Sequence, residues 1–183
     1  GHLYVVAEKE GQVVRFDGET GAALGPFVWD DPDTDEDETG GLSGPTAAAF
    51  GPDGHLYVCG FNSHSVLRYD GATGAFMDVF VEAGDGGLAG PDAGMQFGPD
   101  GLLYVPGFSS HLIHRYDGAT GAYVDALDGG LRNPRSLLFD GEGRLWVTSW
   151  GSGEVVRFSA DGAHLDTFAE VFAPSGIAFD EAA

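Results

Sequence analysis

Two short segments of the sequence combine an aromatic side chain with a histidine three residues later. Phe61 precedes His64 in the segment FNSH, and Phe108 precedes His111 in the segment FSSH. A ring that stacks and an imidazole that hydrogen-bonds can together bind a sugar or an aromatic ligand. The same histidines are the candidate general bases if the protein is an enzyme. The structural alternative is that the rings pack and the imidazoles hydrogen-bond to loop carbonyls.

A second candidate is the acidic segment 30–38, which contains seven carboxylates. Its alternating aspartates can offer oxygen atoms to Ca²⁺; they are Asp31, Asp33, Asp35 and Asp37. The segment lacks the glycine and the terminal glutamate spacing of an EF-hand, so a solvated loop is the competing interpretation. Ca²⁺ is therefore the one cofactor for which the sequence offers candidate ligands.

The basic residues form two groups. Four of the eight occupy one repeated position, and we expect each to form a structural pair with a turn aspartate or with a backbone carbonyl of the neighbouring blade, because an unpaired buried arginine is costly; they are Arg15, Arg68, Arg115 and Arg157. Outside that position, Arg132 and Arg135 with Lys9 carry the main positive charge. These residues can hold an anion or can simply offset the acidic segment.

The elements that must position these residues come from a repeat. A phrase of the type GHLYV…VLRYDG begins at Gly1, Gly54, Gly101 and Gly143, at spacings of 53, 47 and 42 residues. A period of this length without a helical pattern predicts stacked β units. A residue that recurs in every unit is therefore first of all structural, and functional candidates lie where the units differ.

Each unit contains four short apolar runs separated by Gly, Pro, Asp and Asn. In the second unit the runs are 46–50, 55–58, 65–70 and 75–81, which we name strands A to D. Four antiparallel strands with two apolar faces describe a blade of a β-propeller. The sequence thus predicts an all-β propeller in a single domain 1–183, with units 1–44, 45–90, 91–133 and 134–172. In the third unit His114 replaces an apolar residue of strand C.

The two ends of the chain allow two arrangements of the propeller, a closed ring or an open arc. The first unit begins at strand B, and the segment 173–183 resembles a strand A without the rest of a blade. The two ends can share one blade and close a ring of four, which would hide two edge strands. The alternative is an arc of a larger ring, and the start at Gly1 without Met leaves room for a removed leader.

The loops divide into two faces. The A–B and C–D turns are short and nearly invariant, whereas the B–C and D–A loops vary, so we expect the binding face on the B–C and D–A side. Phe61 and Phe108 lie in B–C loops, where Trp150 and Glu8 are the equivalent residues. The predicted ligand-binding set is therefore Phe61, His64, Phe108, His111, Trp150, Arg132 and Arg135.

Charge narrows the possible partners. The net charge of −21 argues against nucleic acid and against anionic membrane surfaces. No run of 18 apolar residues predicts a membrane span. The remaining partners are a small molecule, a glycan or a protein.

The phrases GPTAAAFGPDGHLYV and SVLRYDGATGAFMDVFV, preceded by GGLSGP, resemble NHL-type repeats of bacterial secreted or surface propellers. They are also similar to the superfamily of streptogramin-lyase-like and gluconolactonase-like (SMP-30) propellers. The resemblance implies a propeller fold and an extracytoplasmic location. It leaves function open, because related propellers include enzymes and binding proteins.

Lyase-like relatives carry a catalytic histidine after the proline that opens strand A, but this chain has Thr46, Asp92, Arg135 and Ser175 there. The Glu, Asn and Asp set that holds a metal in lactonase-like relatives cannot be mapped either. We therefore expect a non-catalytic ligand- or protein-binding propeller. A metal-assisted lactonase-like hydrolase or lyase using His64 or His111 is the first alternative, and a structural or adhesive module is the second.

Overall fold

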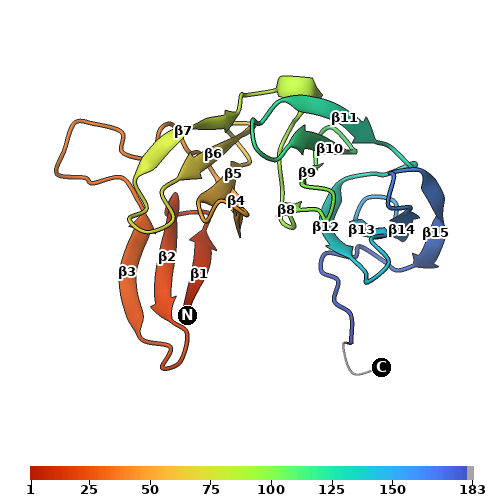
Figure 1. The fold of residues 1–183 in the computed structure, drawn as a ribbon, viewed down its shortest axis with the longest axis horizontal. Helices are drawn as coiled ribbons and strands as arrows, with labels where there is room; N and C mark the ends of the chain where they lie inside the picture. The colour runs from red at the N-terminus through yellow and green to blue at the C-terminus, as the bar shows by residue number, and fades with distance from the viewer. Residues whose placement is uncertain (181–183) are drawn as a thin grey trace.

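The chain folds into four antiparallel β-sheets that follow one another around an arch, with the first and last sheets at its two ends (Figure 1). This computed structural model describes residues 1–180. Sheet 1 has three strands and sheets 2, 3 and 4 have four strands each. The all-β propeller architecture predicted from the repeat is confirmed.

The strands follow the four repeats in order. Sheet 1 contains β1 (His2–Ala7), β2 (Gln12–Asp17) and β3 (Ala23–Val28). Sheet 2 contains β4 (Pro45–Phe50), β5 (Leu56–Gly60), β6 (Ser65–Tyr69) and β7 (Phe76–Val81). Sheet 3 contains β8 (Gln96–Phe97), β9 (Leu102–Gly107), β10 (Leu112–Asp117) and β11 (Tyr123–Leu127). Sheet 4 contains β12 (Pro134–Phe139), β13 (Leu145–Ser149), β14 (Glu154–Phe158) and β15 (His164–Glu170).

The turn between strands C and D is a repeated local structure. In sheet 2 the Oδ1 atom of Asp70 accepts hydrogen bonds from the backbone N and the Oγ1 of Thr73, at 2.9 Å each. Asp17 with Thr20, and Asp117 with Thr120, form the same contacts. An aspartate that binds the backbone ahead of it fixes a tight turn, so this motif sets where strand D begins.

The hydrophobic cores lie between consecutive sheets and not inside any one of them. Val58 and Leu67 of sheet 2 face Val13 and Phe27 of sheet 1, and two further clusters fill the spaces between sheets 2 and 3 and between sheets 3 and 4. Each sheet is therefore stable only when a neighbour covers its face, which is the physical basis of a stacked repeat.

One aromatic contact recurs at each of these interfaces. The strand B aromatic packs edge-on against the phenylalanine that ends strand A of the following sheet. The ring centroids of Tyr4 and Phe50 are 4.9 Å apart, those of Tyr57 and Phe97 are 5.0 Å apart, and those of Tyr104 and Phe139 are 4.9 Å apart. These pairs set the position of each sheet relative to the next.

Sheet 3 departs from the repeat at its first strand. The segment 91–97 has one residue more than the segment 45–50, and β8 is reduced to two residues, with an isolated bridge from Pro91 to Gly107. Gly94 lies in the extra turn with φ of 96°, and a Cβ atom there would lie 2.7 Å from the Cα of Ser136. Only glycine fits this close approach between sheets 3 and 4.

The region 161–172, which also has helical character in sequence, forms β15 as the alignment of the repeats predicts. The one helical element among residues 1–180 is the 3₁₀ turn η1 (Asp85–Gly87). Across the described chain, no helix has the length and apolar character needed to cross a membrane.

Of the two arrangements left open by the sequence, a closed ring and an open arc, residues 1–180 form the open arc. β1 is hydrogen-bonded to β2 alone, so the first sheet remains three-stranded. The segment 174–180 is not part of any sheet; it lies against sheet 4, where the rings of Phe179 and Trp146 are 5.3 Å apart. Strand β1 and the segment 174–180 therefore lie at opposite ends of an open arch (Figure 1). The last three residues of the predicted strand, 181–183, lie outside the described residues.

Candidate functional site

Two sets of equivalent repeat positions meet in one pocket on the B–C and D–A side. The first set is the residue that follows strand B in each sheet: Glu8, Phe61, Phe108 and Trp150. The second set follows the proline that opens strand A: Thr46, Asp92 and Arg135. Together they line a pocket of about 220 Å³. The repeat thus places one residue of each kind from successive sheets around a common opening.

The three aromatic residues of the pocket are held by the same backbone hydrogen bond. The backbone N of each donates to the carbonyl of the residue before the strand A proline of its own sheet. The distances are 2.8 Å from Phe61 to Gly44, 2.9 Å from Phe108 to Gly90 and 3.2 Å from Trp150 to Asn133. Because the proline fixes its own φ, this contact anchors the aromatic residue to a rigid point.

The aromatic rings form a continuous wall. The ring centroids of Phe61 and Phe108 are 6.1 Å apart, and those of Phe108 and Trp150 are 6.0 Å apart. Trp150 is 42% exposed, so part of its indole is accessible from solvent. The wall can therefore stack against a ring of a ligand.

Register shifts in strand A direct the side chains of the second set toward the pocket. The register of β4 against β5 shifts between Pro45 and Ala47, and that of β12 against β13 shifts between Pro134 and Leu137. A shift of this kind re-aims the side chains within it, and Thr46 and Arg135 lie inside the two shifts. The Oγ1 of Thr46 donates a hydrogen bond of 2.8 Å to the carbonyl of Pro91.

An ion pair joins sheets 3 and 4 in the wall of the pocket. The Nε of Arg135 donates to Oδ2 of Asp92 at 3.0 Å, and the guanidinium carbon lies 6.0 Å from the centroid of the Phe108 ring. Asp92 is 5% exposed, so the arginine compensates a nearly buried carboxylate. Among residues 1–180 no hydrogen-bond partner is recorded for the terminal nitrogens of Arg135, which can donate to a ligand.

His64 and His111 lie in the predicted B–C loops, but their side chains bind the backbone beside the pocket. The Nδ1 of His64 accepts from the N of Gly90 at 3.0 Å, and the Nδ1 of His111 accepts from the N of Asn133 at 3.1 Å. Both histidines have positive φ, 55° and 64°. An accepting Nδ1 leaves the proton of the neutral ring on Nε2. The expectation of a hydrogen bond to a carbonyl is therefore corrected: the partner is an amide.

These two contacts cross from one sheet to the next. Gly90 and Asn133 are the residues before the strand A prolines of sheets 3 and 4, so each histidine ties its own B–C loop to the D–A loop that follows. Both imidazoles are thus on the side of the molecule that also carries the acidic D–A loop. Neither histidine is among the residues that line the pocket.

Arg132 is separate from Arg135. Its side chain is exposed, and its backbone carbonyl accepts hydrogen bonds from Gly151 at 2.8 Å and from the Oγ of Ser149 at 3.2 Å. Arg132 is not a wall residue of the pocket. The two arginines that sequence placed in one candidate anion site therefore differ in their surroundings.

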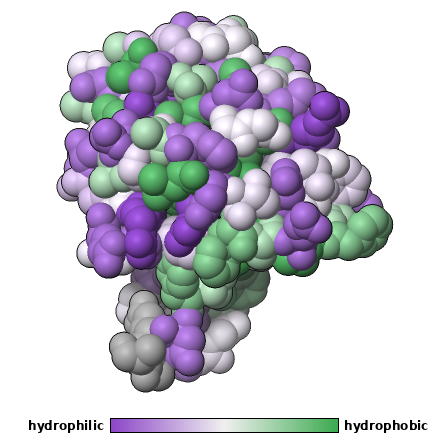
Figure 2. All heavy atoms as spheres, turned by 90° about the vertical axis from the view of Figure 1, so that its right-hand side faces the viewer, coloured by the Kyte–Doolittle hydropathy of each residue, from purple (hydrophilic) through white to green (hydrophobic). Residues whose placement is uncertain are grey.

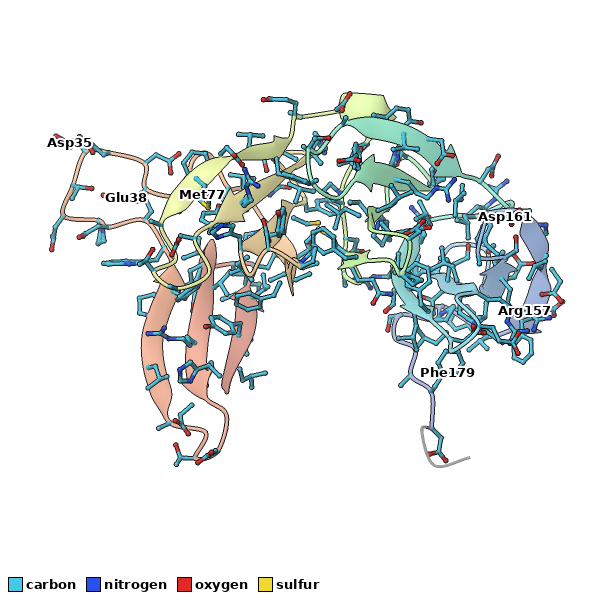
Figure 3. The ribbon with its side chains drawn as sticks, in the orientation of Figure 1. Asp35, Glu38, Met77, Arg157, Asp161 and Phe179 are labelled. Atoms are coloured by element: carbon cyan, nitrogen blue, oxygen red, sulfur yellow. The ribbon has the colours of Figure 1, made fainter. Side chains whose placement is uncertain are left out.

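Four of the seven carboxylates of the acidic loop accept hydrogen bonds from within the loop: Asp30, Asp31, Asp37 and Glu38. Glu38 accepts hydrogen bonds from the N of Asp31 at 3.0 Å and from the Oγ1 of Thr34 at 2.6 Å, and Asp37 accepts from the Oγ1 of Thr39 at 2.6 Å. This last bond lowers the pKa of Asp37. Within residues 1–180, no three side chains of His, Cys, Asp or Glu gather as metal ligands would. The loop, with Asp35 near its tip, projects away from the arch (Figure 3).

A second cavity of about 390 Å³ lies at the base of this loop. Its walls combine aromatic and acidic residues with the C–D turn of sheet 2: Phe27, Trp29, Asp37, Glu38, Thr73, Gly74, Ala75 and Phe76. It is larger than the first pocket but lacks a basic residue. It is the competing location for a ligand.

Sequence reasoning included Phe61, Phe108, Trp150 and Arg135 in the binding set and missed Glu8, Thr46 and Asp92 as wall residues. The missed signal is the second aligned position. The residue after the strand A proline is aligned in every unit, just as the residue after strand B is. Because the D–A and B–C loops lie on one side of a propeller, this alignment could have placed Thr46 and Asp92 at the same opening.

No protein-family model and no curated protein matches the sequence. Solved structures with a similar fold include a catalytically inactive virginiamycin B lyase from Staphylococcus aureus with quinupristin, at a TM-score of 0.74 and 17% identity over 98% of this chain and 57% of that one. Hydrazine synthase of Kuenenia stuttgartiensis has a TM-score of 0.71 and 21% identity, over 96% of this chain and 47% of that one.

The nidogen in a nidogen/laminin complex has a TM-score of 0.66 and 18% identity, over 93% of this chain and 59% of that one. This chain therefore spans about half the length of these structures. The resemblance to NHL- and streptogramin-lyase-like propellers is confirmed at the level of the fold. At such low identity the likeness carries no statement about activity.

Proposed function

We propose that this protein is a non-catalytic binding propeller that takes a neutral sugar or aromatic ring into the pocket between Phe61, Phe108 and Trp150. The observation that carries the proposal is the convergence of two aligned sets of side chains on one opening. An apolar wall with a few polar groups that fix orientation is the usual composition of a small-molecule site.

The polar groups favour a neutral, hydroxylated ligand. Arg135 is already paired with Asp92, so the pair adds no net charge and can donate and accept hydrogen bonds at fixed positions. Glu8 adds an exposed carboxylate at the rim. With a net charge of −21, an anionic ligand would approach against the field of the whole protein.

The hydrolase or lyase alternative has less support from the residues. The lone pair of Nδ1 in His64 and in His111 is occupied by a backbone amide, so neither histidine has a free base at that atom. At the position of the lyase-like catalytic histidine, the pocket presents Thr46, Asp92 and Arg135. Protein ligands stay possible, because structurally similar propellers include the nidogen of a protein complex. An extracytoplasmic location stays a prediction.

The proposal can be tested by titrating the protein with methyl and phenyl glycosides, using calorimetry for binding and NMR spectra of the glycoside for turnover. We expect binding without a new chemical species, and at least about tenfold weaker binding for Phe108→Ala. Phe76→Ala, which removes an exposed aromatic ring from the second cavity, is the matched control and should bind normally. Glycoside turnover, or binding unaffected by Phe108→Ala, would contradict the proposal.

A further inference from the structure

The cavity at the base of the acidic loop has walls that suit a cation. Two aromatic rings in its wall are partly accessible to solvent, since Trp29 is 41% exposed and Phe76 is 36% exposed. The carboxylates of Asp37 and Glu38 line the same cavity. Of the described residues that line it, none is a lysine or an arginine. The cavity therefore combines aromatic rings and negative charge with no basic side chain to neutralise them.

Two of these wall features are departures from the repeat. Trp29 follows the last residue of strand D in sheet 1, and the residues at the same place in sheets 2 and 3 are Glu82 and Asp128. The first repeat spacing, 53 residues against 47 and 42, is the longest, and the acidic segment 30–38 lies within it. A loop that differs between otherwise similar units is where a binding function is expected.

Contacts within and between the first two sheets hold the aromatic wall. The rings of Phe76 and Tyr69 pack edge-on, with centroids 6.0 Å apart. The Phe76 ring also lies against the backbone of Gly40, where a side chain would collide with it. In the same way, Gly74 of the C–D turn lies against the carbonyl of Phe27. Sheet 2 is thereby docked onto the end of β3, so the cavity is formed before any ligand arrives.

Hydrogen bonds hold the two wall carboxylates in place and in their charged form. Asp37 accepts from the backbone N and the Oγ1 of Thr39, at 2.9 and 2.6 Å, and Glu38 accepts from the Oγ1 of Thr34 at 2.6 Å. These bonds lower the pKa of both carboxyl groups. In Figure 3, Glu38 lies at the base of the loop near β7, whereas Asp35 lies near its tip. Both wall carboxylates are therefore negative at neutral pH.

Sheet 4 contains a similar combination with a cation already in place. The guanidinium carbon of Arg157 lies 5.0 Å from the ring centroid of Trp146 and 4.9 Å from that of Phe168. The same side chain pairs with Asp166. Figure 2 looks onto this end of the molecule, where apolar residues lie among hydrophilic ones. Two aromatic rings and a carboxylate thus hold a cation within this chain.

We propose that the cavity lined by Trp29, Phe76, Asp37 and Glu38 binds a small molecule that carries an alkylated ammonium group, for which choline is the probe. Such a cation is attracted to the face of an aromatic ring, and most strongly to that of tryptophan. The carboxylates supply the opposite charge. This site is separate from the pocket between Phe61, Phe108 and Trp150 and does not depend on the function proposed for that pocket.

A metal ion suits these walls less well. Ca²⁺ takes about six to eight oxygen ligands, and within residues 1–180 no three side chains of His, Cys, Asp or Glu gather as metal ligands would. Aromatic rings supply no oxygen ligand, whereas they attract an ammonium group directly. The net charge of −21 favours the approach of any cation, so the rings must supply the selectivity.

Calorimetric titration with choline at constant ionic strength tests the proposal, because fixed salt keeps the nonspecific attraction of cations constant. We expect saturable binding that weakens at least about tenfold in Trp29→Ala. Trp150→Ala, which removes an indole from the other pocket, is the matched control and should bind choline as the wild type does. The neutral analogue of choline, in which carbon replaces the nitrogen, has the same shape and should bind at least about tenfold more weakly.

Two further arms separate the rings from the carboxylates and from a loss of folding. Trp29→Phe keeps an aromatic ring and should retain more affinity than Trp29→Ala, while Glu38→Gln should weaken binding severalfold through the lost charge. Phosphocholine carries the same ammonium group with a phosphate, which the two carboxylates repel, so it should bind more weakly than choline. Absence of choline binding, equal binding of the neutral analogue, tighter binding of phosphocholine, or full affinity in Trp29→Ala would overturn the proposal.

Discussion

Arg15 lies opposite Gly25 across strands β2 and β3, at the position where the other three strand C arginines face an aspartate. Arg68 forms two hydrogen bonds with Asp78, at 3.1 and 2.5 Å, and Arg115 and Arg157 bind Asp125 and Asp166 in the same way. Among the described residues, the Nε of Arg15 is buried without a hydrogen-bond partner. The structural role predicted for this arginine position is confirmed in three sheets, with a carboxylate of strand D as the partner.

This difference predicts opposite outcomes for two substitutions. Asp78→Ala leaves Arg68 without its carboxylate and should lower the free energy of unfolding by about 1 kcal/mol, a value limited by the partial exposure of the pair. Arg15→Met removes a buried Nε without a partner and replaces the cation–π contact with Phe27 by a thioether–aromatic one, so it should be neutral or stabilising. Urea denaturation of both variants measures the difference, and equal destabilisation by both would contradict it.

The close packing of sheets 3 and 4 requires a residue without a side chain at position 94. Gly94→Ala should destabilise the protein by about 1–3 kcal/mol more than Gly87→Ala. Both glycines have positive φ, 96° and 85°, but a Cβ at Gly87 meets open space while one at Gly94 meets the backbone of sheet 4. The comparison of melting temperatures thus separates the steric contact from backbone strain. Similar losses in the two variants would show that sheets 3 and 4 approach less closely there.

His114 predicts a pH dependence of stability. Burial lowers the pKa of His114 below its ordinary value of 6.5, an effect that the nearby Gly86 backbone partly opposes. The unfolded chain therefore binds a proton more readily, and stability is lost as the pH falls below 6.5. His114→Leu introduces the residue found at position 67 and should flatten this slope.

The measurement for His114 is the midpoint of urea unfolding over a range of pH, compared between wild type and variant so that the many carboxylates cancel. Substitution of the exposed His2 by Gln is the control and should leave the slope unchanged. A slope that is the same with and without His114 would contradict the assignment.

The acidic loop predicts a weak and unselective response to divalent cations. Four of its seven carboxylates accept hydrogen bonds from the loop's own backbone and threonines, and no three of them gather as metal ligands would within residues 1–180. Millimolar Ca²⁺ and Mg²⁺ should therefore change the melting temperature by equal small amounts, through screening alone. A rise specific to Ca²⁺ that disappears in Asp33→Asn would instead reveal a metal site.

Much of the fold could be predicted because the repeat makes each strand visible several times. Even the strand His164–Glu170, whose local sequence also suits a helix, follows from its alignment with the other D strands. Closure could not be predicted, since the resemblance of the segment 174–180 to a strand A does not fix where that segment lies relative to β1. The sequence did not identify Asp78 as the partner of Arg68 either. Which residue lies opposite Arg68 depends on how strands C and D pair and on the register shift next to Arg68.

The candidate site was predicted in part for the same reason. Alignment identified Phe61, Phe108 and Trp150 as equivalent residues at one opening. It could not show that His64 and His111 turn their Nδ1 atoms to the backbone, because that depends on a positive φ and on the D–A loop of the next sheet. Nor could it show that Asp92 is buried and paired with Arg135.

The most direct test of the binding site compares Trp150→Ala with Trp29→Ala in calorimetric titrations with a phenyl glycoside. Each substitution removes an indole from one of the two cavities. We predict that Trp150→Ala weakens binding at least about tenfold, while Trp29→Ala binds as the wild type does. Binding that survives the loss of Trp150 and is lost with Trp29 would place the ligand at the acidic loop and contradict the account.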